Sequence, residues 1–144
     1  MIKDHLAETL ELFKSGYNCA QSVLAAFCED YNLPRETAFR IASPFGGNKR
    51  GNVCGAITGA MMVAGLKYGT SSSNDPETKQ LILEKINQLK IAFKETHDTT
   101  ICNELLGVAD SELNTQALII ERPQLLKTCS GFLKTVVIYL EEEL

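Results

Sequence analysis

GNVCGAITGAMMVAG, residues 51–65, carries a single thiol, Cys54, near its start and is otherwise small and apolar. The apolar run extends from Val53 to Leu66, a span of 14 residues that includes three glycines and one threonine. A helix that crosses a bilayer needs about 20 residues, so this run is too short to do so. We therefore expect it to form a buried helix in the core of the protein.

One face of this predicted helix is made of unusually small residues. Gly55 and Gly59 lie four residues apart, and a row of alanines runs beside them. A glycine inside a helix costs about 1 kcal/mol relative to alanine, but it allows another backbone to approach closely. We expect tight helix packing at Gly59. Gly55 directly follows Cys54 and leaves its sulfur unshielded, so a partner thiol, a substrate or a cofactor could approach there.

Helical periodicity extends through most of the chain. Apolar residues recur at three- and four-residue intervals, whereas the short β-branched runs typical of strands are few. We expect an all-α fold: an irregular single-domain bundle of about five or six helices over residues 1–144, with a glycine-rich loop, PFGGNKRGN, before the fourth helix. The predicted helices cover residues 6–15, 18–31, 34–43, 51–65, 76–96 and 129–144, and a short helix lies within residues 98–107.

The charge balance is mildly acidic. The chain has a net charge of −4 and an isoelectric point of about 5.2. Lys49 and Arg50 form only a local basic spot, whereas a nucleic-acid-binding protein needs a basic face. The composition therefore argues against nucleic acid as a partner.

The N-terminal residues mix charged and apolar side chains, unlike the continuous apolar centre of a signal peptide. We therefore expect a cytoplasmic protein without a membrane span. In that compartment, cysteines serve as redox groups or metal ligands more often than as structural disulfides.

Five cysteines are dispersed along the chain, and no two of them form a CxxC motif. Four follow residues that commonly cap helices, so we place each in the first turn of a helix: Cys19, Cys54, Cys102 and Cys129. Free N–H groups and the positive end of the helix dipole stabilise a thiolate there and lower its pKa. Lys49 and Arg50 would add to this effect at Cys54. We expect these four sulfurs to be reactive or metal-binding and to converge in the fold.

The fifth cysteine, Cys28, falls at the far end of its predicted helix, beside Glu29 and Asp30. Both the helix dipole and these carboxylates oppose its ionisation. It also lies nine residues after Cys19, which corresponds to about 13.5 Å along a helix and exceeds disulfide reach. We therefore expect Cys28 to be a small hydrophobic residue of the core.

The cysteine pattern resembles a known family of redox-active proteins of similar length, the C_GCAxxG_C_C family. Its CGAxxG motif stands here as Cys54-Gly55-Ala56-Ile57-Thr58-Gly59, and Cys19 in YNCAQSVL is the first cysteine. Cys102 and Cys129 occupy the third and fourth places, while Cys28 has no counterpart. The resemblance covers nearly the whole chain and implies a redox role for the four matching cysteines. A related cysteine-containing domain occurs in some multihaem cytochromes that also carry an iron–sulfur cluster.

Three functions are compatible with these observations. In the first, Cys54 is a low-pKa nucleophile and Cys19, Cys102 or Cys129 resolves the mixed disulfide, as in a thiol-dependent oxidoreductase or electron carrier. In the second, the same four cysteines bind a [2Fe–2S] cluster or zinc. In the third, the chain is a non-catalytic helical interaction domain whose small-sided helix packs on a partner. We favour the first, with an unidentified redox partner and a homo-oligomer as a possible state.

The two histidines are weaker candidates. His97 lies five residues before Cys102 and could assist a thiol as a base. His5 lies among mixed neighbours, and we expect it to face solvent.

Overall fold

The structure is a computed structural model that describes residues 4–46, 53–106 and 122–143. The regular elements within these ranges are helical, so the predicted all-α class is confirmed. They are α1 (His5–Lys14), α2 (Cys19–Phe27), α3 (Arg35–Ala42), α4 (Gly55–Tyr68), α5 (Pro76–His97), α6 (Cys102–Leu106) and α8 (Arg122–Glu143), with short 3-10 helices η1 (Cys28–Tyr31) and η2 (Ser43–Phe45).

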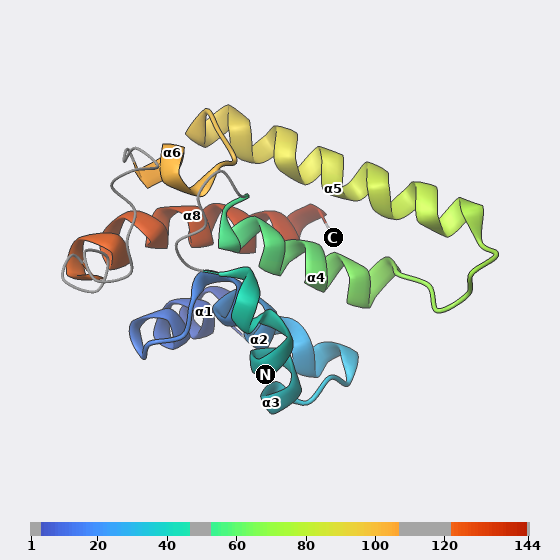
Figure 1. The fold of residues 1–144 in the computed structure, drawn as a ribbon, viewed down its shortest axis with the longest axis horizontal. Coiled ribbons are helices and arrows are strands. Elements are labelled where there is room, and N and C mark those ends of the chain that lie inside the picture. The colour runs from blue at the N-terminus through green and yellow to red at the C-terminus, as the bar shows by residue number, and fades with distance from the viewer. Residues whose placement is uncertain (1–3, 47–52, 107–121, 144) are drawn as a thin grey trace.

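Helix α4 lies at the centre of the molecule, between α5 and the layer formed by α1, α2 and α3, with α8 behind it (Figure 1). Its most extensive contact is with α2. A Cβ atom added at Gly59 would lie 2.9 Å from Cβ of Val23 and 3.0 Å from the carbonyl oxygen of Ala20. Since no side chain fits in that space, the predicted close packing at Gly59 is confirmed.

The start of α2 is fixed by a capping box. The Asn18 side chain accepts a hydrogen bond from the Gln21 N–H at 2.9 Å, and the Gln21 side chain accepts one from the Asn18 N–H at 3.0 Å. Both side chains also donate outward, Asn18 to the carbonyl of Ser43 and Gln21 to that of Phe39, each at 2.9 Å. These bonds tie the first turn of α2 to α3 and η2, and so fix the position of Cys19.

Helix α8 begins earlier than its periodicity predicts. The expected start was Cys129, whereas the helix runs from Arg122. Pro123 falls in the first turn, where proline is tolerated because its missing N–H has no helical partner. Its inward face is apolar, with buried Phe132, Val136, Val137 and Leu140.

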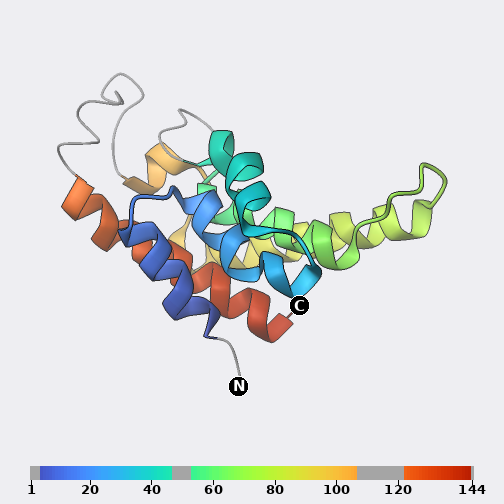
Figure 2. The same ribbon diagram turned by 90° about the horizontal axis from the view of Figure 1, so that it is seen from below.

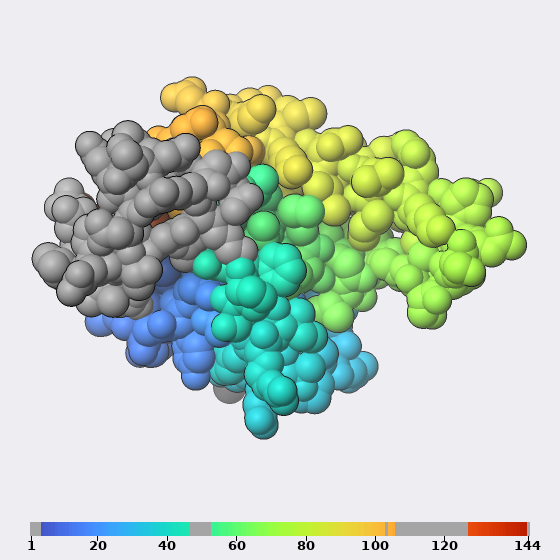
Figure 3. Space-filling model, viewed as in Figure 1, coloured from blue at the N-terminus to red at the C-terminus, as the bar shows by residue number. Residues whose placement is uncertain are grey.

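Helices α4 and α5 form a hairpin that projects from the rest of the molecule (Figures 1 and 3). Within α5, Leu89 and Phe93 are buried, but Leu81 is 38% exposed. The buried stripe of α5 therefore covers only the part of the helix that lies over the core. No helix in the described ranges is both long enough and apolar enough to cross a membrane.

The expectation that His5 faces solvent is also wrong. Its ring stacks on Phe27 with centroids 4.1 Å apart. Nε2 lies 2.7 Å from Oδ2 of Asp30, and Nδ1 lies 3.4 Å from Oε1 of Glu141. His5 therefore connects α1 to η1 and to the C-terminal end of α8, which Figure 2 shows beside α1.

Candidate functional site

The four cysteines singled out in the sequence come from four different helices. Cys19 is the first residue of α2, Cys54 is the N-cap of α4, and Cys102 is the first residue of α6. Cys129 lies within α8, seven residues after Arg122, so its predicted place in a first helical turn is wrong. The thiols are close enough that Cys129, Cys54 and Cys102 each act on the ionisation of Cys19. We call these four residues the thiol cluster.

Cys54 and Cys102 are brought together by backbone pairing. Val53 and Ile101 form an isolated antiparallel bridge, and the Cys54 N–H donates to the carbonyl of Thr100 at 2.7 Å. Each cysteine directly follows one residue of the bridge. The segment before α4 is thereby joined to the segment before α6, although the two lie far apart in the chain.

Cys19 and Cys54 are brought together by the absence of a side chain at Gly55. A Cβ atom there would lie 2.9 Å from Cβ of Cys19 and 3.1 Å from Cα of Gly46. The space beside Gly55 is thus filled by the start of α2 and by Gly46. Lys49 and Arg50, the other two residues expected near the approach to Cys54, lie outside the described residues.

Cys19 and Cys129 interact directly through a hydrogen bond between their side chains. This bond is the main reason why the pKa of Cys19 lies well above its ordinary value; burial and the neighbouring thiols raise it further. Cys19 is half-buried and Cys129 is 9% exposed. These two sulfurs are therefore a directly contacting pair.

Cys54 is almost fully enclosed, with 3% of its surface exposed. Burial raises its pKa to about 12. The sulfur completes no cap hydrogen bond, but the N–H groups of Ala56 and Ile57 still oppose this rise, whereas Cys102 and Cys129 add to it. The predicted low pKa of Cys54 is therefore wrong, because burial and like charges outweigh the helix N-terminus.

Cys28 is separate from the thiol cluster, as predicted. It caps the C-terminal end of α2, is fully buried, and donates a hydrogen bond from Sγ to the carbonyl of Ala25 at 3.4 Å. It is packed as a small core residue and provides an internal control for experiments on the other thiols.

The arrangement of the thiol side chains decides whether the cluster fits a metal ion. Among the described residues, no group of three or more His, Cys, Asp or Glu side chains is arranged to hold a metal ion. Electrostatic interaction extends further than a zinc–sulfur bond of about 2.3 Å, so thiols can influence one another without sharing an ion. The reduced side chains as placed do not fit a zinc ion or an iron–sulfur cluster.

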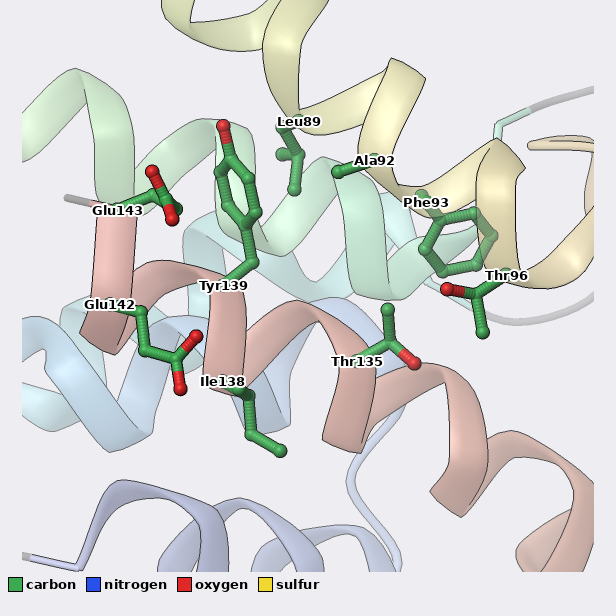
Figure 4. Close-up of a pocket in the computed structure, with 9 residues that line it drawn as sticks. All are labelled: Leu89, Ala92, Phe93, Thr96, Thr135, Ile138, Tyr139, Glu142 and Glu143. Carbon is green, nitrogen blue, oxygen red and sulfur yellow. The ribbon is translucent and has the colours of Figure 1, made fainter.

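His97 ends α5 and is directed toward α8. Its Nε2 lies 2.8 Å from Oγ1 of Thr135, and its ring packs against Phe93 and Phe132. Burial lowers its pKa. A hollow of about 180 Å³ lies between the same two helices and is lined by apolar, hydroxyl and carboxylate side chains without any cysteine (Figure 4).

Sequence reasoning missed two features of the site. It did not identify Cys129 as the direct neighbour of Cys19, and it did not identify Thr100 as the backbone partner of Cys54. Pro123 is a local signal that the helix begins before Cys129, but no local pattern indicates the contact of Cys129 with Cys19. The second had no local signal, since a single bridge between distant segments leaves no pattern in either.

The small face of α4 is occupied within the chain. Gly55 and Gly59 both face α2, so this face is not available to a partner protein. The third functional hypothesis requires this face to pack on a partner. The packing of α2 on the same face therefore argues against that hypothesis.

Residues 17–143 match the family described as "Putative redox-active protein (C_GCAxxG_C_C)". Neither the curated proteins nor the solved structures contain a significant match to the chain. The family match covers all four members of the thiol cluster and most of the sequence. The chain therefore belongs to the C_GCAxxG_C_C family.

Proposed function

We propose that the protein is a dithiol–disulfide redox protein in which Cys19 and Cys129 are the primary pair. The observation that carries this proposal is the hydrogen bond between their side chains. Two thiols in hydrogen-bond contact need little movement to form a disulfide, whereas thiols held apart need the backbone to move. Family membership supports a redox role, and the interaction between their side chains favours Cys19 and Cys129 as the pair.

The reaction is a two-electron exchange with an external disulfide, RSSR. One thiolate of the pair attacks a sulfur of RSSR, forms a mixed disulfide and releases RS⁻, which takes up a proton. The second thiol of the pair loses its proton and attacks the protein sulfur of the mixed disulfide, releasing the second RSH. The products are one Cys19–Cys129 disulfide and two RSH, and the reverse sequence reduces a substrate disulfide.

Cys54 and Cys102 form the second part of the site. In the reduced protein Cys54 is held as a thiol, since burial raises its pKa to about 12. Oxidation of Cys19 and Cys129 removes the negative charge that Cys129 can carry, which is one cause of this rise. We infer that the second pair becomes easier to oxidise after the first. A cycle of this kind suits a reducing compartment such as the cytoplasm.

Zinc or a [2Fe–2S] cluster on the same four cysteines is the alternative. The number of sulfurs is right, and a bound metal would lower their pKa values. We prefer the disulfide because one pair is already in contact, whereas the reduced side chains would have to rearrange around an ion. Metal analysis and an absorbance spectrum of anaerobically prepared protein distinguish the two.

The decisive experiment is to oxidise the reduced protein with hydroxyethyl disulfide, a neutral reagent, and to count and map the remaining thiols. We expect the count to fall from five to three, with Cys19 linked to Cys129. The Cys28→Ala variant should lose two of its four thiols in the same way, whereas Cys19→Ser should lose none at comparable rates. A first disulfide between other cysteines, or bound metal in the anaerobic preparation, would overturn the proposal.

A further inference from the structure

The segment that follows α3 is bonded to the starts of two helices that carry members of the thiol cluster. It comprises residues 43–46, and we call it the η2 segment. Its Ser43 carbonyl accepts a hydrogen bond from the Asn18 side chain at 2.9 Å, immediately before α2. Its Phe45 carbonyl accepts one from Oγ1 of Thr58 at 3.0 Å, near the start of α4. One short segment therefore connects the two helix starts.

Gly46 ends the η2 segment at a place where no side chain fits. A Cβ atom there would lie 2.1 Å from Oδ1 and 2.2 Å from Cγ of Asn18. The Cα atom of Gly46 also lies 3.1 Å from the place where a Cβ of Gly55 would be, and Cβ of Cys19 lies 2.9 Å from the same place. Gly46 therefore packs against the Asn18 side chain and borders the same space as Cys19.

The Asn18 side chain makes two different bonds. Its oxygen accepts a hydrogen bond from the Gln21 N–H and so caps α2, whereas its amide group donates to the η2 segment. Capping needs only the acceptor. The donated bond is therefore additional to capping, and it fixes the first turn of α2, which begins with Cys19, relative to the η2 segment.

The other thiol of the primary pair is held by helix packing. Cys129 lies inside α8 and is 9% exposed, and Phe132 and Leu133 in the following turn are buried. A disulfide requires the two sulfurs, now in hydrogen-bond contact, to approach to about 2.05 Å. Since Cys129 is held by α8, this approach depends on where the first turn of α2 is placed.

We propose that Asn18 and Gly46 are positioning residues that keep Cys19 close to Cys129 and thereby favour the disulfide over the two thiols. The inference rests on the proposed function and specifies what sets the redox equilibrium of the same pair. Groups held at short distance react as though at high concentration, because less entropy is lost when they join. Loss of the bond to the η2 segment frees the first turn of α2 and shifts the equilibrium toward the dithiol. The exchange is otherwise the one given above: the pair loses two electrons and two protons to an external disulfide, which becomes two thiols.

The test measures the equilibrium constant for the Cys19–Cys129 disulfide in redox buffers of dithiothreitol or glutathione, with acid quenching and peptide mapping. Asn18→Ser keeps an N-cap acceptor but lacks the amide that donates to Ser43. Gly46→Ala leaves Asn18 and both thiols unaltered but displaces the Asn18 side chain. We expect each variant to lower the equilibrium constant about tenfold, which raises the reduction potential of the pair by about 30 mV.

Two control variants make similar changes at the far end of the α4–α5 hairpin (Figure 1). Asp75 is the N-cap of α5 and accepts a hydrogen bond from the Thr78 N–H at 3.1 Å, so Asp75→Ser alters a cap. Gly69→Ala adds a Cβ atom that would lie 2.3 Å from the carbonyl oxygen of Gly65. Gly69→Ala should lower stability, but neither control should change the equilibrium constant of the thiol pair.

An unchanged or increased equilibrium constant in Asn18→Ser and Gly46→Ala, or an equal fall in the controls, would overturn the inference. A fall in only one of the two variants would also overturn it, since both residues are proposed to act through the same bond. If excess glutathione disulfide forms no Cys19–Cys129 disulfide in the unaltered protein, the proposed function itself fails. The peptide map distinguishes that result from a shifted equilibrium.

Discussion

The first half of α4 is enclosed by α2, whereas its last turns lead into the projecting α4–α5 hairpin (Figures 1 and 3). At Gly55 and Gly59 the backbone of α4 lies against α2 so closely that neither position can hold a Cβ without movement. At Gly65 no atom lies within 4 Å of the place where a Cβ would be. The same residue type thus serves close packing at one end of the helix and has no packing role at the other.

This difference between the two ends of α4 bears on the candidate site, because the enclosed end also carries Cys54. Close packing brings α2, and with it Cys19, to the start of α4. The hairpin end has exposed apolar residues on α5, Leu81 and Leu83, and no cysteine. The close packing of α2 on α4 therefore holds Cys19 beside the start of α4.

The largest change in stability should come from adding a side chain at the end of α4 that α2 encloses. We expect Gly59→Ala to lower the free energy of unfolding by about 2 kcal/mol, since the added methyl group would overlap the backbone of Ala20 and the side chain of Val23. Urea unfolding of the reduced protein measures this change. A variant as stable as the unaltered protein would contradict the close approach of α2 to α4.

The next effect concerns the ionisation of Cys54. Its folded-state pKa is raised to about 12, so the stability it contributes is complete below pH 9 and is lost as the pH rises from 9 toward 12. By pH 10 the loss should be about 1 kcal/mol.

Urea midpoints at pH 8 and pH 10, under reducing conditions, check this effect. The Cys54→Ala variant should lose less stability over that interval than the unaltered protein. Parallel losses in the two proteins would mean that Cys54 is ionised as easily in the folded state as in the unfolded chain.

At the hairpin end of α4 we expect a substitution to increase stability. Gly65→Ala adds a helix-favouring residue where there is free space, and it should raise the free energy of unfolding by about 1 kcal/mol. The measurement is the same as for Gly59→Ala, so the two variants form a matched pair. A loss of stability at Gly65 as large as that at Gly59 would remove the distinction between the two ends.

The smallest effect belongs to His97, at the end of α5 that packs on α8. Burial lowers its folded-state pKa, so its contribution is complete above pH 6.5 and is lost as the pH falls below that value. We expect His97→Gln to flatten the pH dependence of stability between pH 7.5 and pH 5. Thermal unfolding at these two pH values provides the measurement, and an unchanged slope would contradict the effect.

Much of the fold could be predicted from short-range patterns. The cap at Asn18, the turn at Gly16 and the start of α5 at Pro76 all lie where propensity places them, because each depends on neighbouring residues alone. The start of α8 could not be placed in this way. Its first turn has little apolar periodicity, and only Pro123 marks it.

The candidate site, like the fold, could be predicted from the sequence only in part. Cys19, Cys54 and Cys102 do lie at helix starts, as their neighbours in sequence predict, and Cys28 is set apart, whereas Cys129 lies inside α8. Their pKa values could not be inferred, because burial and the charges of neighbouring thiols exceed the contribution of a helix N-terminus. Cys54 was expected to be the most acidic thiol, yet it is held in the protonated form.

The sequence by itself determined the helices, the small face of α4 and the set of four cysteines, since these depend on periodicity, capping and residue size within one segment. The tertiary structure alone decided that Cys19 contacts Cys129, that Thr100 fixes the backbone at Cys54, and that α2 fills the space at Gly55. Each of these contacts joins residues far apart in the chain. Such contacts are set by how whole helices pack against one another, and the residues on either side of a contact carry no local record of it.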